Sequence, residues 1–117
     1  MVDIAGVLQE RAKTHGNFYN QACASMDVLN AMERSSNWKH LDPDKREALI
    51  LIAVKIGRIL TGNIYEPDHW ADIAGYAKLV ADRLEQRRAG QAKASQDAGT
   101  YLKMAAIGGE YNQRSPR

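Results

Sequence analysis

Hydrophobic residues recur every three or four positions along most of this chain, which is the spacing of amphipathic helices. The first predicted helix begins after Asp3, whose carboxylate suits an N-cap, and ends at the glycine-containing segment 15–17. A second helix is predicted from about residue 18 to residue 33, followed by the turn-forming segment 35–37. No segment alternates convincingly between polar and apolar residues, so the sequence predicts essentially no sheet.

The third and fourth predicted helices have the clearest boundaries. Asp42 suits the N-cap of the third helix and Pro43 its first position, where a missing N–H costs nothing. Residues 48–60 read ALILIAVKIGRIL, which is apolar on every face and belongs in the middle of a helical assembly. Pro67 opens a fourth helix that continues to about Arg88. The pattern predicts an all-α fold, an antiparallel bundle of about four helices that is completed by oligomerisation.

A change of composition after residue 88 divides the chain into two predicted parts. Residues 1–88 form the helical domain. Residues 89–117 are rich in Ala, Gly, Gln and Ser, which bury little apolar surface, so they are predicted to be an extension. A small apolar cluster predicts a helical part around residues 98–107, and residues 111–117 are expected to be a flexible tail.

The charge distribution argues against a protein that binds duplex nucleic acid. The net charge is +2, but residues 1–88 contain twelve basic and twelve acidic side chains, so the surplus lies in the extension. No basic recognition helix is visible. Apolar runs stay below the roughly 18 residues that a membrane span needs, so no membrane partner is expected either.

The single cysteine, Cys23, excludes an internal disulfide framework and favours a reducing compartment. It lies between two alanines in a predicted helix, so we expect a small buried hydrophobe and not a nucleophile. The first residues match neither a secretory signal nor a transit peptide, and the expected location is therefore the cytoplasm.

Two cations, Lys55 and Arg58, interrupt the apolar central helix. They are three residues apart and project from the same side, with Glu47 on nearly the same face almost three turns earlier. Burying a cation without a partner costs several kcal/mol, so both groups need an opposing charge. The next helix offers Asp68 and Asp72, which are four residues apart and stack on one face. Antiparallel packing brings these carboxylates toward the two cations.

Two interpretations of this cluster are open. In the first, Lys55 and Arg58 form buried ion pairs with acidic residues such as Asp72 and Glu47 and hold the bundle in register. In the second, the cations face a cleft and bind phosphate, because a guanidinium fork matches phosphate oxygens and a lysine adds a point charge. Nearby imidazole and aromatic groups are candidate contacts for a base: His69, Trp70, Tyr76, Phe18 and Tyr19.

The segment from Glu47 to Leu84 resembles a known family. Its motifs VKIGRI and DHWADIAGYAKL, together with the sequence HGNF at residues 15–18, are similar to a phage-encoded branch of the MazG-like all-α nucleoside triphosphate pyrophosphohydrolases. The resemblance covers roughly residues 8–88 and implies a MazG-like bundle in the cytoplasm of a phage-infected host cell. In the wider superfamily, an ExxE motif on one helix and an ExxD motif on the next bind the magnesium that positions a nucleotide's phosphates.

This chain departs from those two motifs in charge. Lys55-xx-Arg58 stands at the position of ExxE, while Asp72 matches the aspartate of ExxD and His69 stands three residues before it. The resemblance and the inverted charge together indicate a protein that binds phosphorylated nucleotides or nucleotide signals without a metal. For a phage protein this implies sequestration of a host immune messenger. The expected ligand-binding residues are Lys55, Arg58, His69, Trp70 and Tyr76.

Two alternatives to this leading interpretation remain open. One is a magnesium-dependent nucleoside triphosphate pyrophosphohydrolase, in which Glu47, Asp68 and Asp72 are the catalytic and metal-binding residues. The other is a structural or protein-interaction bundle without any nucleotide ligand. The leading interpretation requires no cofactor, whereas the enzyme requires magnesium.

Overall fold

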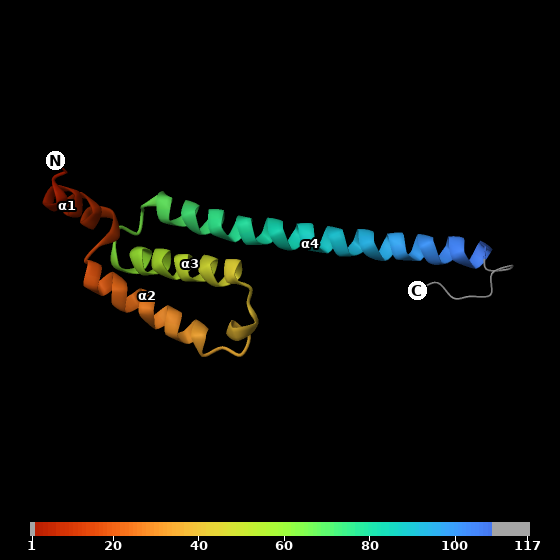
Figure 1. The fold of residues 1–117 in the computed structure, drawn as a ribbon. Coiled ribbons are helices and arrows are strands. Elements are labelled where there is room, and N and C mark those ends of the chain that lie inside the picture. The colour runs from red at the N-terminus through yellow and green to blue at the C-terminus, as the bar shows by residue number, and fades with distance from the viewer. Residues whose placement is uncertain (1, 109–117) are drawn as a thin grey trace. The chain divides into compact units, whose positions relative to one another are not determined.

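The computed structural model describes residues 2–108, and every regular element within that range is helical. This confirms the predicted all-α class. Four α-helices and one short 3-10 helix follow one another along the chain (Figure 1). Their bounds are α1 Ile4–His15, α2 Phe18–Glu33, η1 Trp38–His40, α3 Pro43–Thr61 and α4 Pro67–Gly108.

The helix starts lie where local chemistry predicts them. The Asp3 carboxylate accepts the N–H of Gly6 at 3.1 Å, and the side-chain oxygen of Asn17 accepts the N–H of Asn20 at 3.1 Å. These two bonds cap α1 and α2 at their N-termini. Both α3 and α4 begin with a proline, a residue that suits the first helical position because no N–H is required there.

The chain forms two compact units, Met1–Val80 and Ala81–Arg117, and α4 contributes residues to both. The sequence predicted a helix end near residue 88 and an extension beyond it with a helical part around residues 98–107, whereas α4 continues without a break to Gly108. Half of residues 89–108 are Ala, Gln or Lys, which are strong intrinsic helix formers, so the segment is helical although its side chains are almost all exposed up to residue 104. The predicted flexible tail, residues 111–117, lies outside the described residues.

The packed centre of the first unit is the contact between α2 and α3. Gly57 of α3 lies directly against α2: a Cβ at this position would overlap the Ser25 hydroxyl and lie 2.8 Å from the Gln21 carbonyl oxygen. The glycine therefore allows the two helices to approach closely. Around this contact, the buried hydrophobic residues of the described chain are only Ala48 and Ala53.

Large hydrophobic side chains are mostly not buried within a single chain. No large side chain is fully buried in the described part, and Leu60 of the apolar helix α3 keeps 67% of its surface exposed. Cys23, predicted to be buried, is also exposed, so that prediction is wrong for the single chain. None of the described helices is both long and apolar enough to cross a membrane.

Candidate functional site

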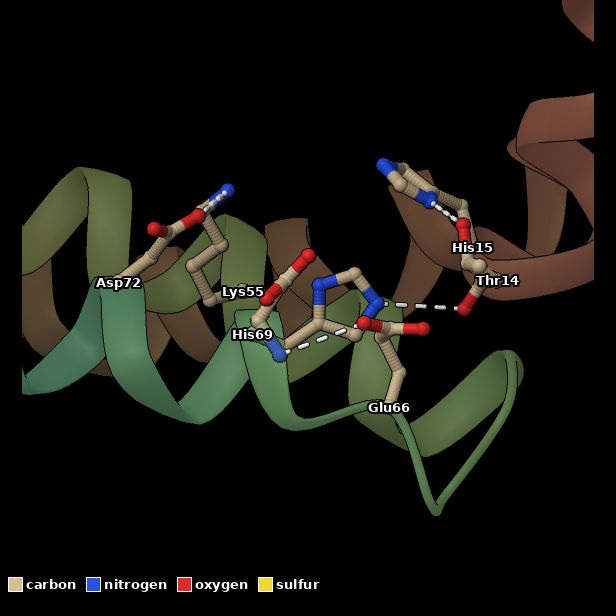
Figure 2. A network of polar contacts seen from close by, with 7 residues as sticks. Thr14, His15, Lys55, Glu66, His69 and Asp72 are labelled. Carbon is tan, nitrogen blue, oxygen red and sulfur yellow. Dashed lines mark hydrogen bonds and ion pairs between the residues drawn. The ribbon is translucent and has the colours of Figure 1, made fainter.

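Lys55 of α3 and Asp72 of α4 form an ion pair, which is the kind of contact expected under the first interpretation of the cluster. Their Nζ and Oδ2 atoms are 2.7 Å apart, and the lysine side chain is only 12% exposed while the aspartate side chain is 48% exposed (Figure 2). The hydrogen bond from Lys55, together with its charge, lowers the pKa of Asp72 below its ordinary value. The charge of Lys55 is thus neutralised within the protein.

Arg58, one turn further along α3, has no such partner. Its Nε atom is buried without a hydrogen bond, and no ion pair to Arg58 forms within residues 2–108. Burial and then repulsion by Arg11 lower the pKa of Arg58, while Asp72 and Tyr76 act in the opposite direction. Because Asp72 is already bonded to Lys55, Arg58 is a partly buried cation whose charge is not neutralised.

Two histidines lie beside these cations. His69 is 2% exposed, and its Nε2 donates to the carbonyl oxygen of Thr14 at 3.2 Å. The ring centroids of His69 and His15 are 5.0 Å apart in an edge-to-face arrangement, with an interplanar angle of 82°. The Nδ1 atom of His15 is hydrogen-bonded to the Thr14 hydroxyl (Figure 2). His69 therefore ties α4 to the end of α1, next to His15.

Two glycines hold the α1–α2 connection against the α3–α4 connection. Gly16 has a φ of +74°, and a Cβ there would overlap the carbonyl oxygen of Thr61. A Cβ at Gly62 would likewise overlap the carbonyl oxygen of Thr14, which also accepts the N–H of Asn63 at 3.0 Å. This close backbone contact requires glycine at both positions, and it fixes the end of α1, including His15, beside the end of α3.

The charged side chains that act on His15 are cations. Burial lowers the pKa of His15, and the charges of Arg58, His69, Arg11 and Lys55 lower it further, in that order. These groups come from three helices, α1, α3 and α4. The acidic side chain coupled to the same cluster is Asp72, which is paired with Lys55. The cluster therefore has an excess of positive charge and suits an anion.

A groove of about 410 Å³ lies beside this cluster, at the junction of α1 and α2. Arg11 and His15 line it from α1, and Asn17 and Phe18 line it at the start of α2. No acidic residue lines this groove. The arrangement combines cationic side chains with an aromatic ring that is 78% exposed, and such a surface can hold an anion attached to a planar group.

The carboxylates proposed for the magnesium alternative do not come together in the single chain. Glu47 and Asp68 are exposed, and Asp72 is engaged by Lys55. Residues 2–108 contain no group of three or more His, Cys, Asp or Glu side chains that is placed to hold a metal ion. The backbone N–H of Asp68 donates to Glu66 at 3.4 Å, a contact within the helix start and not with the cations.

The remaining predicted ligand residues differ in their surroundings. Tyr76 is partly buried and electrostatically coupled to Arg58, as the sequence placed it. Trp70 is 57% exposed, and no described contact joins it to the cluster. The sequence did not identify Arg11 or His15 as ligand-binding residues. Their spacing of four residues on one helix was the available signal, because it places both side chains on one face.

Comparison with protein-family models, with curated proteins and with solved structures finds no match for this chain.

Proposed function

We propose that this chain binds phosphorylated nucleotides or nucleotide-derived signals, using a MazG-like bundle in which cations replace the carboxylates of one metal motif. The observation that carries the proposal is Arg58, whose guanidinium is partly buried, lacks an acidic partner and lies near Arg11 and His15. A phosphate group supplies the missing charge and accepts the fork of N–H donors that a guanidinium presents.

The charge of the site also explains why the proposal requires no metal. A magnesium ion needs several oxygen ligands and a net negative site, whereas this cluster is net positive. Cations of the chain then take the role of neutralising the phosphate. Without assembled carboxylates to activate water, the expected outcome is binding without turnover, which suits sequestration of the ligand in the cytoplasm.

A ligand screen tests the proposal. We expect nucleoside mono-, di- and triphosphates or cyclic dinucleotides, but not the unphosphorylated nucleosides, to raise the melting temperature of the purified protein. A ligand present at 100 times its Kd stabilises by about 2.7 kcal/mol, which corresponds to a shift of roughly 10 °C or more for a unit of this size. The absence of any shift across the panel would instead favour a purely structural or protein-interaction bundle.

A hydrolysis assay on the same protein distinguishes binding without turnover from hydrolysis. Each nucleoside triphosphate is incubated with the protein and magnesium, and pyrophosphate release is measured. We expect no release above the protein-free control. Release that disappears in the Asp72→Ala variant would replace the binding function with the magnesium-dependent pyrophosphohydrolase, since Asp72 is the carboxylate that matches the catalytic motif.

A further inference from the structure

We propose that the ligand is a single nucleotide that lies in the groove at the α1–α2 junction, with its base on Phe18 and its phosphate between Arg11, His15 and Arg58. This inference rests on the proposed function and specifies both the position and the size of its ligand. It assigns contacts to Arg11 and Phe18 and narrows the range of nucleotides to those with one base.

The cations define where the phosphate lies. Arg11 and His15 are one turn apart on α1 and both line the groove, and Arg58 of α3 is close enough for its charge and that of Arg11 to repel each other. No acidic side chain lines the groove to separate them. Arg11 and His15 therefore converge in the groove, and Arg58, which does not line the groove, adds positive charge next to it, so an anion placed there relieves their mutual repulsion.

The start of α2 adds to the same positive region. Asn17 caps this 16-residue helix, and the N–H groups of Phe18 and Tyr19 in its first turn have no intrahelical carbonyl to bond. The positive end of the helix dipole thus lies at the wall of the groove that already carries Arg11 and His15. The side-chain cations are the main source of positive charge at the groove, and the N-terminus of α2 adds to it.

Phe18 defines where the base lies. Its ring is 78% exposed, and Leu8 of α1 contributes a second apolar surface to the same groove. A planar base that stacks on the ring covers exposed apolar surface while its phosphate stays beside the cations. An inorganic anion alone leaves this aromatic surface uncovered.

The volume of the groove is compatible with one nucleotide. At about 410 Å³ it lies near the lower end of the roughly 300–1,000 Å³ range of ligand pockets. We expect one base and one phosphate to occupy the groove itself, whereas the second base of a cyclic dinucleotide would extend beyond it. The tightest ligand is therefore expected among nucleotides with one base.

Calorimetric titration tests this arrangement with three kinds of probe: the four ribonucleoside monophosphates, ribose 5-phosphate and a cyclic dinucleotide. We expect a monophosphate to bind most tightly, with ribose 5-phosphate at least tenfold weaker because it lacks the base. With the best monophosphate, Phe18→Ala and Arg11→Ala should each weaken binding about tenfold or more, consistent with the effects of base–aromatic stacking and of charged hydrogen bonds.

Matched controls come from neighbouring residues. Tyr19→Ala removes an equally exposed aromatic ring next to Phe18 that does not line the groove, and Lys13→Ala removes a cation of α1 that is paired with Glu10. Both should bind like the wild type. Phe18→Trp, which keeps an aromatic surface, should retain binding, so loss of affinity in Phe18→Ala can be separated from misfolding.

The outcomes distinguish this inference from the function on which it rests. If Arg58→Met loses binding while Phe18→Ala and Arg11→Ala retain it, the protein binds nucleotides but the groove assignment is wrong. Tighter binding of the cyclic dinucleotide overturns the size assignment. If Phe18→Ala changes the oligomeric mass and leaves affinity unchanged, the groove is a protein contact. If no phosphorylated probe binds, the proposed function itself fails.

Discussion

Lys55 and Arg58 lie three residues apart on α3, and the protein neutralises one of them and not the other. Asp72 bonds to Lys55 at 2.7 Å, and this contact leaves Arg58 beside Arg11 and the two histidines. A folded protein tolerates such an arrangement where a ligand removes the repulsion, and charged groups of this kind are concentrated at functional sites. Lys55 is thus paired within the chain, whereas Arg58 is the cation that the proposed function assigns to phosphate.

At the residue scale, His15 gives a prediction about pH. Its pKa is lowered from its ordinary value of 6.5 by burial and by nearby cations, so the ligand-free folded state takes up its proton less readily than the unfolded chain. Its contribution therefore makes the free protein less stable as the pH falls below about 6.5. A bound phosphate opposes these cations and raises the pKa, so that ligand binding takes up a proton.

We therefore expect nucleotide affinity to rise a few-fold between pH 8 and pH 6.5, within the roughly tenfold per pH unit that one linked proton allows. Calorimetry in two buffers of different ionisation enthalpy measures the proton uptake directly. The His15→Gln variant is the control for titration of the phosphate itself and should show a smaller pH dependence. Identical pH profiles for the variant and the wild type would show that His15 is not linked to binding.

The sequence predicted part of this site correctly. It placed Lys55, Arg58 and Asp72 together, because helical spacing and an antiparallel turn between two helices determine which residues share a face. It did not show which cation takes the single nearby acid, since that depends on the register between α3 and α4. Arg11 and His15 were missed as a pair because their position depends on the contact of Gly16 with Thr61, which links parts of the chain far apart in sequence.

At the element scale, the helix starts were predictable and the end of α4 was not. Capping residues and prolines act within a few residues of a helix start, so the local sequence is enough to predict these starts. The continuation of α4 beyond residue 88 follows from intrinsic helix propensity and not from an apolar face. Composition alone therefore suggested a linker where the backbone stays helical.

The contact between α2 and α3 gives the second prediction. Gly57→Ala places a methyl group against the Ser25 hydroxyl and 2.8 Å from a backbone oxygen, so we expect a loss of about 1–3 kcal/mol in urea unfolding. Ser25→Ala alone should be nearly neutral, because its buried hydroxyl has no hydrogen-bond partner to lose. The double variant should recover part of the loss, since the nearest clash is gone.

Gly75→Ala is the matched control for this helix contact. A Cβ at Gly75 meets nothing within 4 Å in the described chain, so alanine should stabilise the helix by about 0.5–1 kcal/mol. A Gly57→Ala protein as stable as the wild type would show that α2 and α3 do not cross this closely.

At the scale of the whole molecule, the described residues bury little hydrophobic surface within a single chain. Ala48 and Ala53 are the buried hydrophobic residues of the described chain, while many larger ones are exposed. A helix that is apolar on every face must pack against other elements on every face to be buried. We therefore expect the chain to self-associate, as the sequence predicted, since a second copy is always available to cover the same surfaces.

This expectation gives the third prediction. Light scattering after size exclusion should yield the mass of at least two chains. The melting temperature should rise by several degrees over a hundredfold increase in protein concentration, because association stabilises by mass action. A single-chain mass with cooperative unfolding that is independent of concentration would mean that the chain is stable without a partner copy.

In residues 1–88 the positive charge of the candidate site is a local feature and not part of an overall positive charge. Residues 1–88 carry equal numbers of acidic and basic side chains, so no general positive field attracts nucleic acid. The excess of positive charge at Arg11 and Arg58, beside His15, comes from their arrangement in the fold. This distribution is the reason that the proposed ligand is a small anion and not a polyanion.

The most direct measurement is calorimetric titration of the best ribonucleoside monophosphate into the wild type and the Arg58→Met variant, together with their unfolding curves. Methionine keeps the length and removes the charge. We expect affinity to fall by tenfold to a hundredfold, the loss typical of hydrogen bonds to charged groups, while stability stays equal or rises because a buried, unneutralised cation is gone. The exposed Arg34→Met variant should leave both unchanged. Equal affinity in Arg58→Met and the wild type would contradict the role of Arg58 in binding phosphate.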